Sequence, residues 1–146
     1  MEDQPVLGII CGGGPAPGLN GVIASATLYA KRLYWKVLGF HDGYLHLASG
    51  NKQEVEENTV ELTEDMVIPV ENAGGSILRT DRFDPSKSQQ SIANIVRMLG
   101  EFKVRHLIVI GGNDKITSTY KVTQGVDPAE MSVIVVPKTI DNDVNL

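Results

Sequence analysis

The sequence predicts an open α/β fold: a mainly parallel sheet with helices on both faces, as in a Rossmann-like three-layer sandwich. Two observations support this prediction. Short apolar segments alternate with segments in which apolar residues recur at helical spacing, and glycine-rich or Asp/Asn-rich turns follow several of the apolar segments. Such alternation is typical of parallel strands joined by right-handed helical crossovers.

The first strand and helix have the clearest pattern. Val6–Cys11 is almost entirely apolar and ends in three glycines, which predicts a strand buried on both faces. The residues after the glycines predict an amphipathic helix, because its apolar members recur with a period of about 3.6 residues: Leu19, Val22, Ile23, Ala26, Ala30 and Leu33.

The middle of the chain is less regular. Trp35–Phe40 predicts a second strand, which ends at His41-Asp42-Gly43. The polar stretch Ser49–Glu57 predicts an exposed loop or a poorly packed excursion, and Thr63–Val67 predicts a short helical turn. The glycines within Ala73–Ser76 predict a flexible break before the charged residues 79–82, and we expect this break to be a loop over a site.

The last part of the chain repeats the alternation. Ser86 and Gln89 fit a capping box at the start of a helix, whose apolar side consists of Ile92, Ile95, Val96 and Leu99. Leu107–Ile110 predicts a buried strand that leads through two glycines to a short helix at about residues 115–122. Ser132–Val136 predicts a further strand, which Pro137 stops because proline cannot donate to a sheet.

Composition and charge exclude several classes of function. A chain of 146 residues has the size of one domain, and its 42% apolar and 21% charged residues are typical of globular proteins. The net charge of −5 gives no general attraction to nucleic acid or to an anionic membrane. We expect a cytoplasmic protein, because no apolar stretch is long enough to span a bilayer and the acidic start lacks a secretion-signal pattern.

Three polar or glycine-rich segments each follow a predicted strand: Gly12–Gly18, Gly111–Lys115 and Lys138–Asp143. The carboxyl ends of parallel strands lie at one edge of a sheet, and ligands of such sheets bind outside that edge. The sequence therefore predicts one composite site.

The first of these segments suits phosphate. Glycines between a strand and a helix let backbone amides approach an anion at the helix N-terminus. The segment is neither a dinucleotide fingerprint nor a Walker loop, since no Gly-Lys-Ser/Thr follows. A tight strand-to-helix turn without a ligand explains the same residues equally well.

The last segment suits phosphoryl transfer. In an extended backbone Thr139, Asp141 and Asp143 would lie on one side, because side chains alternate with period two. One carboxylate could then accept the proton of an attacking hydroxyl while another holds a metal ion. An Asp/Asn-rich turn is the alternative, because these residues hydrogen-bond their own backbone.

Four motifs together resemble those of phosphofructokinases, in the same order: Gly-Gly-Gly-Pro-Ala-Pro-Gly-Leu-Asn (12–20), Gly-Gly-Ser-Ile-Leu-Arg-Thr-Asp-Arg-Phe (74–83), Gly-Gly-Asn-Asp (111–114) and Pro-Lys-Thr-Ile-Asp-Asn-Asp (137–143). The resemblance is strongest to the pyrophosphate-dependent branch. It implies that residues 1–146 are the N-terminal, phosphoryl-donor-binding part of such an enzyme.

The resemblance also implies roles for single residues. Asp141 would be the general base for the 1-hydroxyl of fructose 6-phosphate, Thr139 and Asp143 would contact the sugar substrate, and Asn113 and Asp143 would hold Mg²⁺. Lys138 would act with Asp141 in catalysis. The phosphoryl donor would be bound by Gly13, Gly14, Arg82, Gly112 and Asp114.

Two positions bear on the choice of donor. ATP-using members of the family typically carry glycine where this chain has Asp114 and Lys138. The carboxylate of Asp114 would repel the α-phosphate of ATP, whereas Lys138 could neutralise pyrophosphate and the departing phosphate. Pyrophosphate is therefore the predicted donor, and ATP is the alternative. Structural roles for both side chains, at a helix N-terminus and on the surface, are a further interpretation.

Asn113 departs from the family pattern, which usually has an aspartate associated with the metal at this position. Asn113 keeps an oxygen ligand without the charge, so Mg²⁺ binding could be weaker, Asp114 could replace it, or the protein could be a noncatalytic subunit or binding module. Lys115 stands where the family usually has Ser or Thr.

The chain ends at Leu146, directly after the last predicted site segment. Because the last strand lacks a following helix to cover it, we expect a truncated domain. The resemblance implies that the part that binds the sugar is absent. The resemblance implies that the parent enzyme is a homo-oligomer and that these residues alone are inactive.

Overall fold

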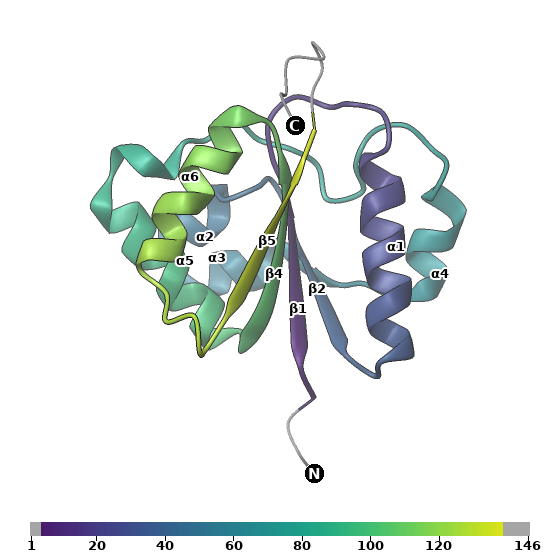
Figure 1. The fold of residues 1–146 in the computed structure, drawn as a ribbon, viewed down its shortest axis with the longest axis horizontal. Helices are drawn as coiled ribbons and strands as arrows, with labels where there is room; N and C mark the ends of the chain where they lie inside the picture. Colours follow the sequence, from purple (N-terminus) through teal and green to yellow (C-terminus); the bar gives the residue numbers. More distant parts are fainter. Residues whose placement is uncertain (1–3, 139–146) are drawn as a thin grey trace.

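The structure is a computed structural model that describes residues 4–138. Within that part of the chain, a sheet of five strands has the order β3-β2-β1-β4-β5 (Figure 1). The strands are β1 (Val6–Cys11), β2 (Lys36–Phe40), β3 (Thr59–Glu61), β4 (Val104–Gly111) and β5 (Ser132–Pro137). The predicted open α/β sheet is therefore confirmed.

The sheet is parallel except at one edge. β1 pairs in parallel with β2 on one side and with β4 on the other, and β5 extends the sheet in parallel from β4. The short strand β3, which the sequence did not predict, is antiparallel to β2. The chain first builds outward from β1 to β2 and later returns to β4, so the direction of winding reverses between β1 and β4. The carboxyl side of such a reversal is where open α/β sheets bind ligands.

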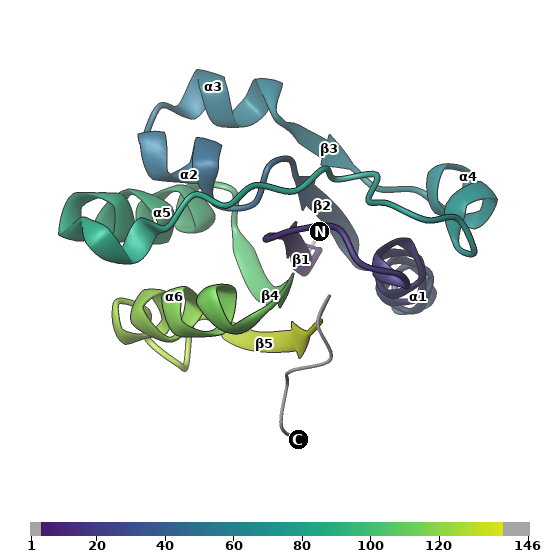
Figure 2. The same ribbon diagram turned by 90° about the horizontal axis from the view of Figure 1, so that it is seen from above.

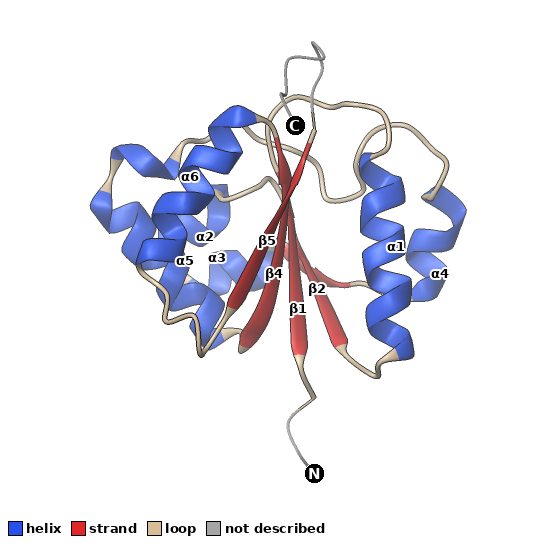
Figure 3. Cartoon of the chain, viewed as in Figure 1, coloured by secondary structure: helices blue, strands red, loops and turns tan. Residues whose placement is uncertain are grey.

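Helices cover both faces of the sheet (Figures 1, 2 and 3). One face carries α1 (Leu19–Arg32) and α4 (Glu64–Val67), and the other carries α2 (Leu45–Ser49), α3 (Lys52–Glu57), α5 (Gln89–Glu101) and α6 (Asn113–Gln124). Two short 3₁₀ helices, Ile68–Val70 and Pro85–Lys87, lie in the connections. Among residues 4–138 no helix combines the length and the apolar character needed to cross a membrane.

The core consists of two apolar layers that share the central strand. From β1, Ile10 packs into the layer formed with α5, and Ile9 packs into the layer formed with α1. Both isoleucines are fully buried, as are Ile95 of α5 and Ile23 of α1. Successive strand residues point to opposite faces, so a strand covered on both faces must be apolar throughout.

The prediction of an exposed loop at Ser49–Glu57 was wrong. Residues 52–57 form α3, whose first turn is capped by the side chain of Asn51, which accepts a hydrogen bond of 3.2 Å from the backbone N–H of Glu54. Val55 is buried in the core. A single buried residue within a polar run does not create an apolar period, so the sequence pattern did not reveal this helix.

The predicted capping box was also misplaced. α5 is capped by Ser88, whose hydroxyl accepts a hydrogen bond of 3.2 Å from the backbone N–H of Ser91. Ser86 instead lies in a 3₁₀ helix, where Asp84 accepts its backbone N–H at 2.9 Å. Pro85 favours this short helix because its φ suits a first helical position.

Candidate functional site

Three strand ends meet at the carboxyl edge of the sheet. The backbone N–H of Gly12 donates to the carbonyl of Ile110 at 2.9 Å, and that of Lys138 donates to the carbonyl of Gly111 at 3.0 Å. The structure thus brings the ends of β1, β4 and β5 to one glycine-lined rim, which we call the glycine rim (residues 12–14, 111–112 and 138). Thr139, Asp141 and Asp143, predicted to complete the site, lie outside the described residues.

The first glycine loop requires unusual backbone conformations. Gly13 has φ +83° and Gly18 has φ +90°, in the left-handed region that glycine occupies without strain. Gly18 is the N-cap of α1, and no side chain within the described residues caps this helix. The loop therefore opens between β1 and α1 and presents the start of α1 to the same edge of the sheet.

Lys138 places a positive charge on this loop. Its ammonium group donates a hydrogen bond to the carbonyl oxygen of Gly14. Its side chain is half-buried, and burial lowers the pKa of Lys138; the nearby charge of Arg82 acts in the same direction, whereas Cys11 opposes it. Lys138 thus supplies a cation at the mouth of the glycine loop, and Arg82 lies near enough for its charge to act on Lys138.

The turn after β4 is much tighter. Gly112 alone separates β4 from α6, which starts at Asn113, two residues earlier than predicted. Asn113 and Asp114 are exposed on the first turn of α6, with Asp114 as the acidic residue favoured there by the helix dipole. Lys115, by contrast, is buried.

A strap of residues 76–84 crosses this edge, and it follows the break at residues 73–76 that was predicted to lie over a site. The carbonyl of Asp81 accepts the backbone N–H of Gly13 at 2.9 Å. The break before the strap is anchored rather than free, because buried Asn20 donates to the carbonyl of Gly74 at 3.1 Å and accepts the N–H of Ile77 at 2.8 Å.

The turn after β2 reaches the same edge. Asp42 and Gly43 both have φ +60°, and a Cβ on Gly43 would lie 3.4 Å from the carbonyl oxygen of Cys11. His46 bridges the Asp42 carboxylate at 2.9 Å and the Glu54 carboxylate at 3.0 Å. Burial opposes the charged imidazole, but the hydrogen bonds to Glu54 and Asp42 outweigh it and raise the pKa of His46.

Comparison with known families shows to which protein family this chain belongs. The sequence profile of the family described as Phosphofructokinase matches residues 6–146. The chain belongs to the phosphofructokinase family. The resemblance inferred from the four motifs is thereby confirmed.

Named relatives of this phosphofructokinase chain include enzymes with different donors in their names. A pyrophosphate–fructose 6-phosphate 1-phosphotransferase of Naegleria fowleri is 42% identical over 145 residues, which cover 99% of this chain and 32% of that protein. One of Thermotoga maritima is 41% identical over 140 residues, covering 96% and 32%. An ATP-dependent 6-phosphofructokinase of Chloroflexus aggregans is 35% identical over 146 residues, covering 94% and 38%. The chain thus spans about a third of the length of these relatives.

Solved structures show the same fold. Phosphofructokinase of Pichia pastoris in the T-state matches with a TM-score of 0.80 at 20% identity, covering 98% of this chain and 16% of that one. A pyrophosphate-dependent phosphofructokinase of Marinobacter aquaeolei matches with a TM-score of 0.78 at 18% identity, covering 94% and 34%. These likenesses concern the fold alone.

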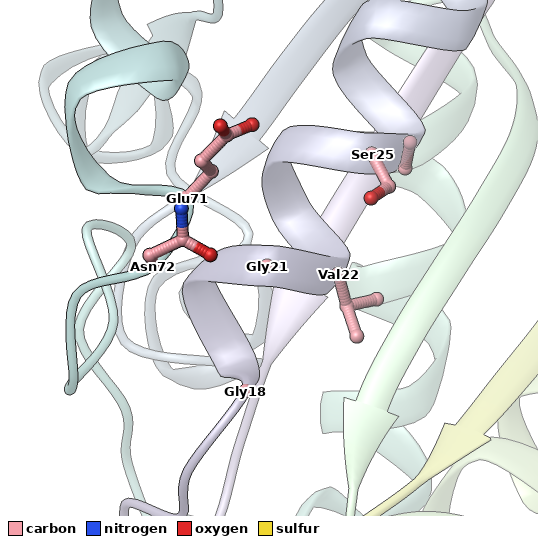
Figure 4. A pocket seen from close by; sticks show the side chains of 7 residues that line it. Gly18, Gly21, Val22, Ser25, Glu71 and Asn72 are labelled. Atoms are coloured by element: carbon pink, nitrogen blue, oxygen red, sulfur yellow. The ribbon is translucent and has the colours of Figure 1, made fainter.

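An open pocket lies between the first half of α1 and residues 71–72, away from the glycine rim (Figure 4). It is lined by residues of α1 between Gly18 and Ala26 and by Glu71 and Asn72, and it includes no described residue of the rim or the strap. The glycine rim is the candidate site instead, because the glycine backbone, Lys138 and the exposed polar start of α6 converge there.

The described residues suit a metal ion only in part. Asn113 and Asp114 offer an amide oxygen and a carboxylate at the rim, and Mg²⁺ commonly binds one or two such groups together with substrate phosphates. Within residues 4–138 no group of three His, Cys, Asp or Glu side chains could hold a metal by itself. This donor set fits a Mg²⁺ that arrives with a phosphate ligand.

Sequence reasoning missed two features of this edge. Buried Lys115 was noted only as a departure from the family pattern, and the pairing of His46 with Asp42 was not predicted. The four-residue spacing of Asp42 and His46 was the available signal, since such a pair becomes adjacent on a helical turn. Nothing local marked Lys115 as buried, because lysine is almost always exposed.

Proposed function

We propose that the protein to which these residues belong transfers a phosphoryl group from pyrophosphate to fructose 6-phosphate, giving fructose 1,6-bisphosphate and phosphate in glycolysis, with Mg²⁺. The contact of the Lys138 ammonium with the carbonyl of Gly14 carries this proposal, because it places a cation at the mouth of a glycine loop. The names of the relatives at 42% and 41% identity support pyrophosphate as the donor.

In the proposed reaction the 1-hydroxyl oxygen of the sugar forms a bond to the terminal phosphorus of pyrophosphate. The bond from that phosphorus to the bridging oxygen breaks, its electron pair leaves with the departing phosphate, and the hydroxyl proton passes to Asp141. Thr139 and Asp143 orient the sugar. Lys138 stabilises the negative charge of the leaving phosphate.

The donor is held at the glycine rim in this proposal. Backbone N–H groups of Gly14 and Gly112 face its oxygens, Gly13 shapes the loop while its own N–H donates to the carbonyl of Asp81, and Arg82 is a further cation. Mg²⁺, held by Asn113 and Asp143, supplies charge neutralisation at the phosphates when bound. Asp114 is exposed two residues after Gly112 and would repel the additional phosphate of ATP.

A coupled enzyme assay on the full-length protein tests which phosphoryl donor it uses. We expect turnover with pyrophosphate and much slower turnover with ATP. Asp114→Gly combined with Lys138→Gly should lower pyrophosphate use and raise ATP use, because it removes both the repulsion and the neutralising cation. Activity with ATP and none with pyrophosphate would overturn the donor assignment.

We also propose that the sugar-binding part, and a homo-oligomeric partner, lie outside residues 1–146. The chain covers 32% of its relatives at 42% and 41% identity, so most of their residues have no counterpart here. The polypeptide of residues 1–146 should show no turnover with either donor. Turnover by this polypeptide would contradict the proposal.

A noncatalytic binding module is the second candidate. Asn113 favours it, because an amide in place of a carboxylate removes one charge from the proposed metal site. Isothermal titration with Mg-pyrophosphate, combined with the coupled assay, distinguishes the two candidates. Saturable heat without turnover in the full-length protein indicates a binding module. The absence of saturable heat indicates a purely architectural module.

A further inference from the structure

Lys115 is a buried cation at the centre of the rim. It is 3% exposed, and its Nζ donates a hydrogen bond of 2.5 Å to the carbonyl of Phe83. The same Nζ lies 5.5 Å from the centre of the buried Tyr44 ring. Burial lowers the pKa of Lys115, while Asp81, Asp84 and Asp114 act in the opposite direction. A lysine is rarely enclosed in this way unless its charge is compensated.

The stem of Lys115 occupies the space that two glycines leave. A Cβ on Gly12 would lie 2.3 Å from Cε of Lys115, and a Cβ on Gly111 would lie 2.4 Å from its Cβ. Neither glycine has a positive φ. These two positions therefore need glycine because a side chain from α6 lies against them.

Among residues 4–138, the ammonium of Lys115 makes one of the hydrogen bonds by which α6 holds the strap, and the hydroxyl of Ser118 makes another. The ammonium donates to the carbonyl of Phe83, and the hydroxyl of Ser118 donates to the Asp84 carboxylate at 3.1 Å. Within the strap the backbone N–H of Phe83 donates to the Asp81 carboxylate at 2.5 Å. The carbonyl of Asp81 in turn accepts the backbone N–H of Gly13.

These contacts form one continuous connection from α6 to the first glycine loop. The Lys115 ammonium donates a hydrogen bond to the carbonyl of Phe83, and the N–H of Phe83 donates to the carboxylate of Asp81. The carbonyl of Asp81 accepts the N–H of Gly13. We propose that Lys115 is a positioning residue of the donor site, which fixes the strap and through it the backbone of Gly13. The effect on the donor rests on the proposed function, whereas the effect on the strap does not.

Lys115→Met tests the ammonium contact in the natural-length protein, because methionine keeps an unbranched stem and removes the donor. Lys121→Met is the matched control, since Lys121 is an exposed lysine on the same helix. We expect Lys115→Met, and not the control, to speed hydrogen exchange of the segment that contains the Gly13 amide by about tenfold. Equal exchange in the two variants would overturn the proposal, whether or not the protein is an enzyme.

Kinetics separate positioning from a general loss of stability. Lys115→Met should raise the KM for pyrophosphate by about tenfold, which equals a loss of about 1.4 kcal/mol of binding, and leave the KM for fructose 6-phosphate within about twofold. Lys115→Arg, which keeps a cationic donor, should restore part of the affinity. A parallel rise in both KM values would overturn the positioning role. If the wild-type protein does not use pyrophosphate, the proposed function is wrong. The hydrogen-exchange experiment then still tests whether Lys115 fixes the strap and the backbone of Gly13.

A double-mutant cycle tests the stem without reference to activity. Gly12→Ala should lower the melting temperature in the wild-type background, and it should have little effect in the Lys115→Ala background, where all three obstructing atoms of the stem (Cγ, Cδ and Cε) are absent. Equal losses in both backgrounds would show that Gly12 is glycine for another reason and would overturn this part of the proposal.

Discussion

The turns after β1 and β4 have the same sequence pattern and different structures. Both follow a central buried strand, both have consecutive glycines at or just after the strand end, and both lead into a helix at the carboxyl edge. The turn after β1 is a long loop in which Gly13 and Gly18 take left-handed conformations. The turn after β4 is a single residue, Gly112, with φ −82°.

The difference teaches that glycine serves two purposes at this edge. In the first turn Gly13 and Gly18 supply backbone conformations that other residues adopt only with strain. At the end of β4, directly before the second turn, Gly111 supplies space, because the side chain of Lys115 lies against it. A strand followed by glycines therefore predicts where a site lies but not what the glycines do.

Gly111→Ala should have the largest effect. Its new Cβ would lie 2.4 Å from the Cβ of Lys115, an atom attached directly to the α6 backbone, so relief requires moving the helix. We expect a loss of about 3 kcal/mol in the free energy of unfolding, measured with denaturant. Gly100→Ala is the control, because a Cβ on this helical glycine would meet no other described part of the chain within 4 Å. Equal effects of the two substitutions would contradict the spatial role.

Gly13→Ala should cost about 2 kcal/mol, mostly because φ +83° is strained for alanine. Its Cβ would also lie 3.0 Å from the Nζ of Lys138, which is the end of a flexible side chain and can move away. Lys138→Met should therefore rescue little of the loss. Full rescue in a denaturant titration of the double variant would show that space, rather than conformation, requires this glycine.

Gly18 isolates the conformational effect. Its φ is +90°, and a Cβ added to it would have no atom of residues 4–138 within 4 Å beyond its chain neighbours, so backbone strain is what opposes substitution. Gly18→Ala should cost about 1 kcal/mol, and Gly18→Asn should cost less, because asparagine tolerates left-handed backbone better. An asparagine variant less stable than the alanine variant by thermal unfolding would exclude this explanation.

The turn after β2 differs from the two glycine turns, because charged side chains rather than glycines hold it. The raised pKa of His46 means that its contacts with Asp42 and Glu54 stabilise the fold fully below the unfolded value of about 6.5, and this contribution is lost as pH rises through the folded pKa. Arg79 also binds Asp42, at 2.9 Å, and keeps that carboxylate paired.

His46→Gln should therefore destabilise by about 0.5 kcal/mol at about pH 5.5 and by less at about pH 8, because the pair is only partly buried. Urea titrations of both proteins at the two pH values measure the difference. A destabilisation that grows with rising pH would contradict the sign of the shift.

The sequence predicted the strands and main helices because their apolar residues repeat with local periods. Val6–Cys11 and Leu107–Ile110 are apolar throughout, as a strand covered on both faces requires, and both lie at the centre of the sheet. α3 was missed because one buried residue, Val55, makes no period. Edge strand β3 is short and half-buried, so it had no clear pattern either.

The sequence alone determined the order of the parallel strands and of the main helices and that glycine-rich segments lie at the ends of β1 and β4, since these properties depend on neighbouring residues and on the shared direction of parallel strands. Only the tertiary structure decided which distant groups meet: Lys115 with Phe83, 32 residues apart, and Lys138 with Gly14, 124 residues apart. The physical reason is that such contacts depend on how the helices pack over the sheet and which side chain fills the space that a glycine leaves. A lysine that will be buried has the same local sequence signature as one that will be exposed.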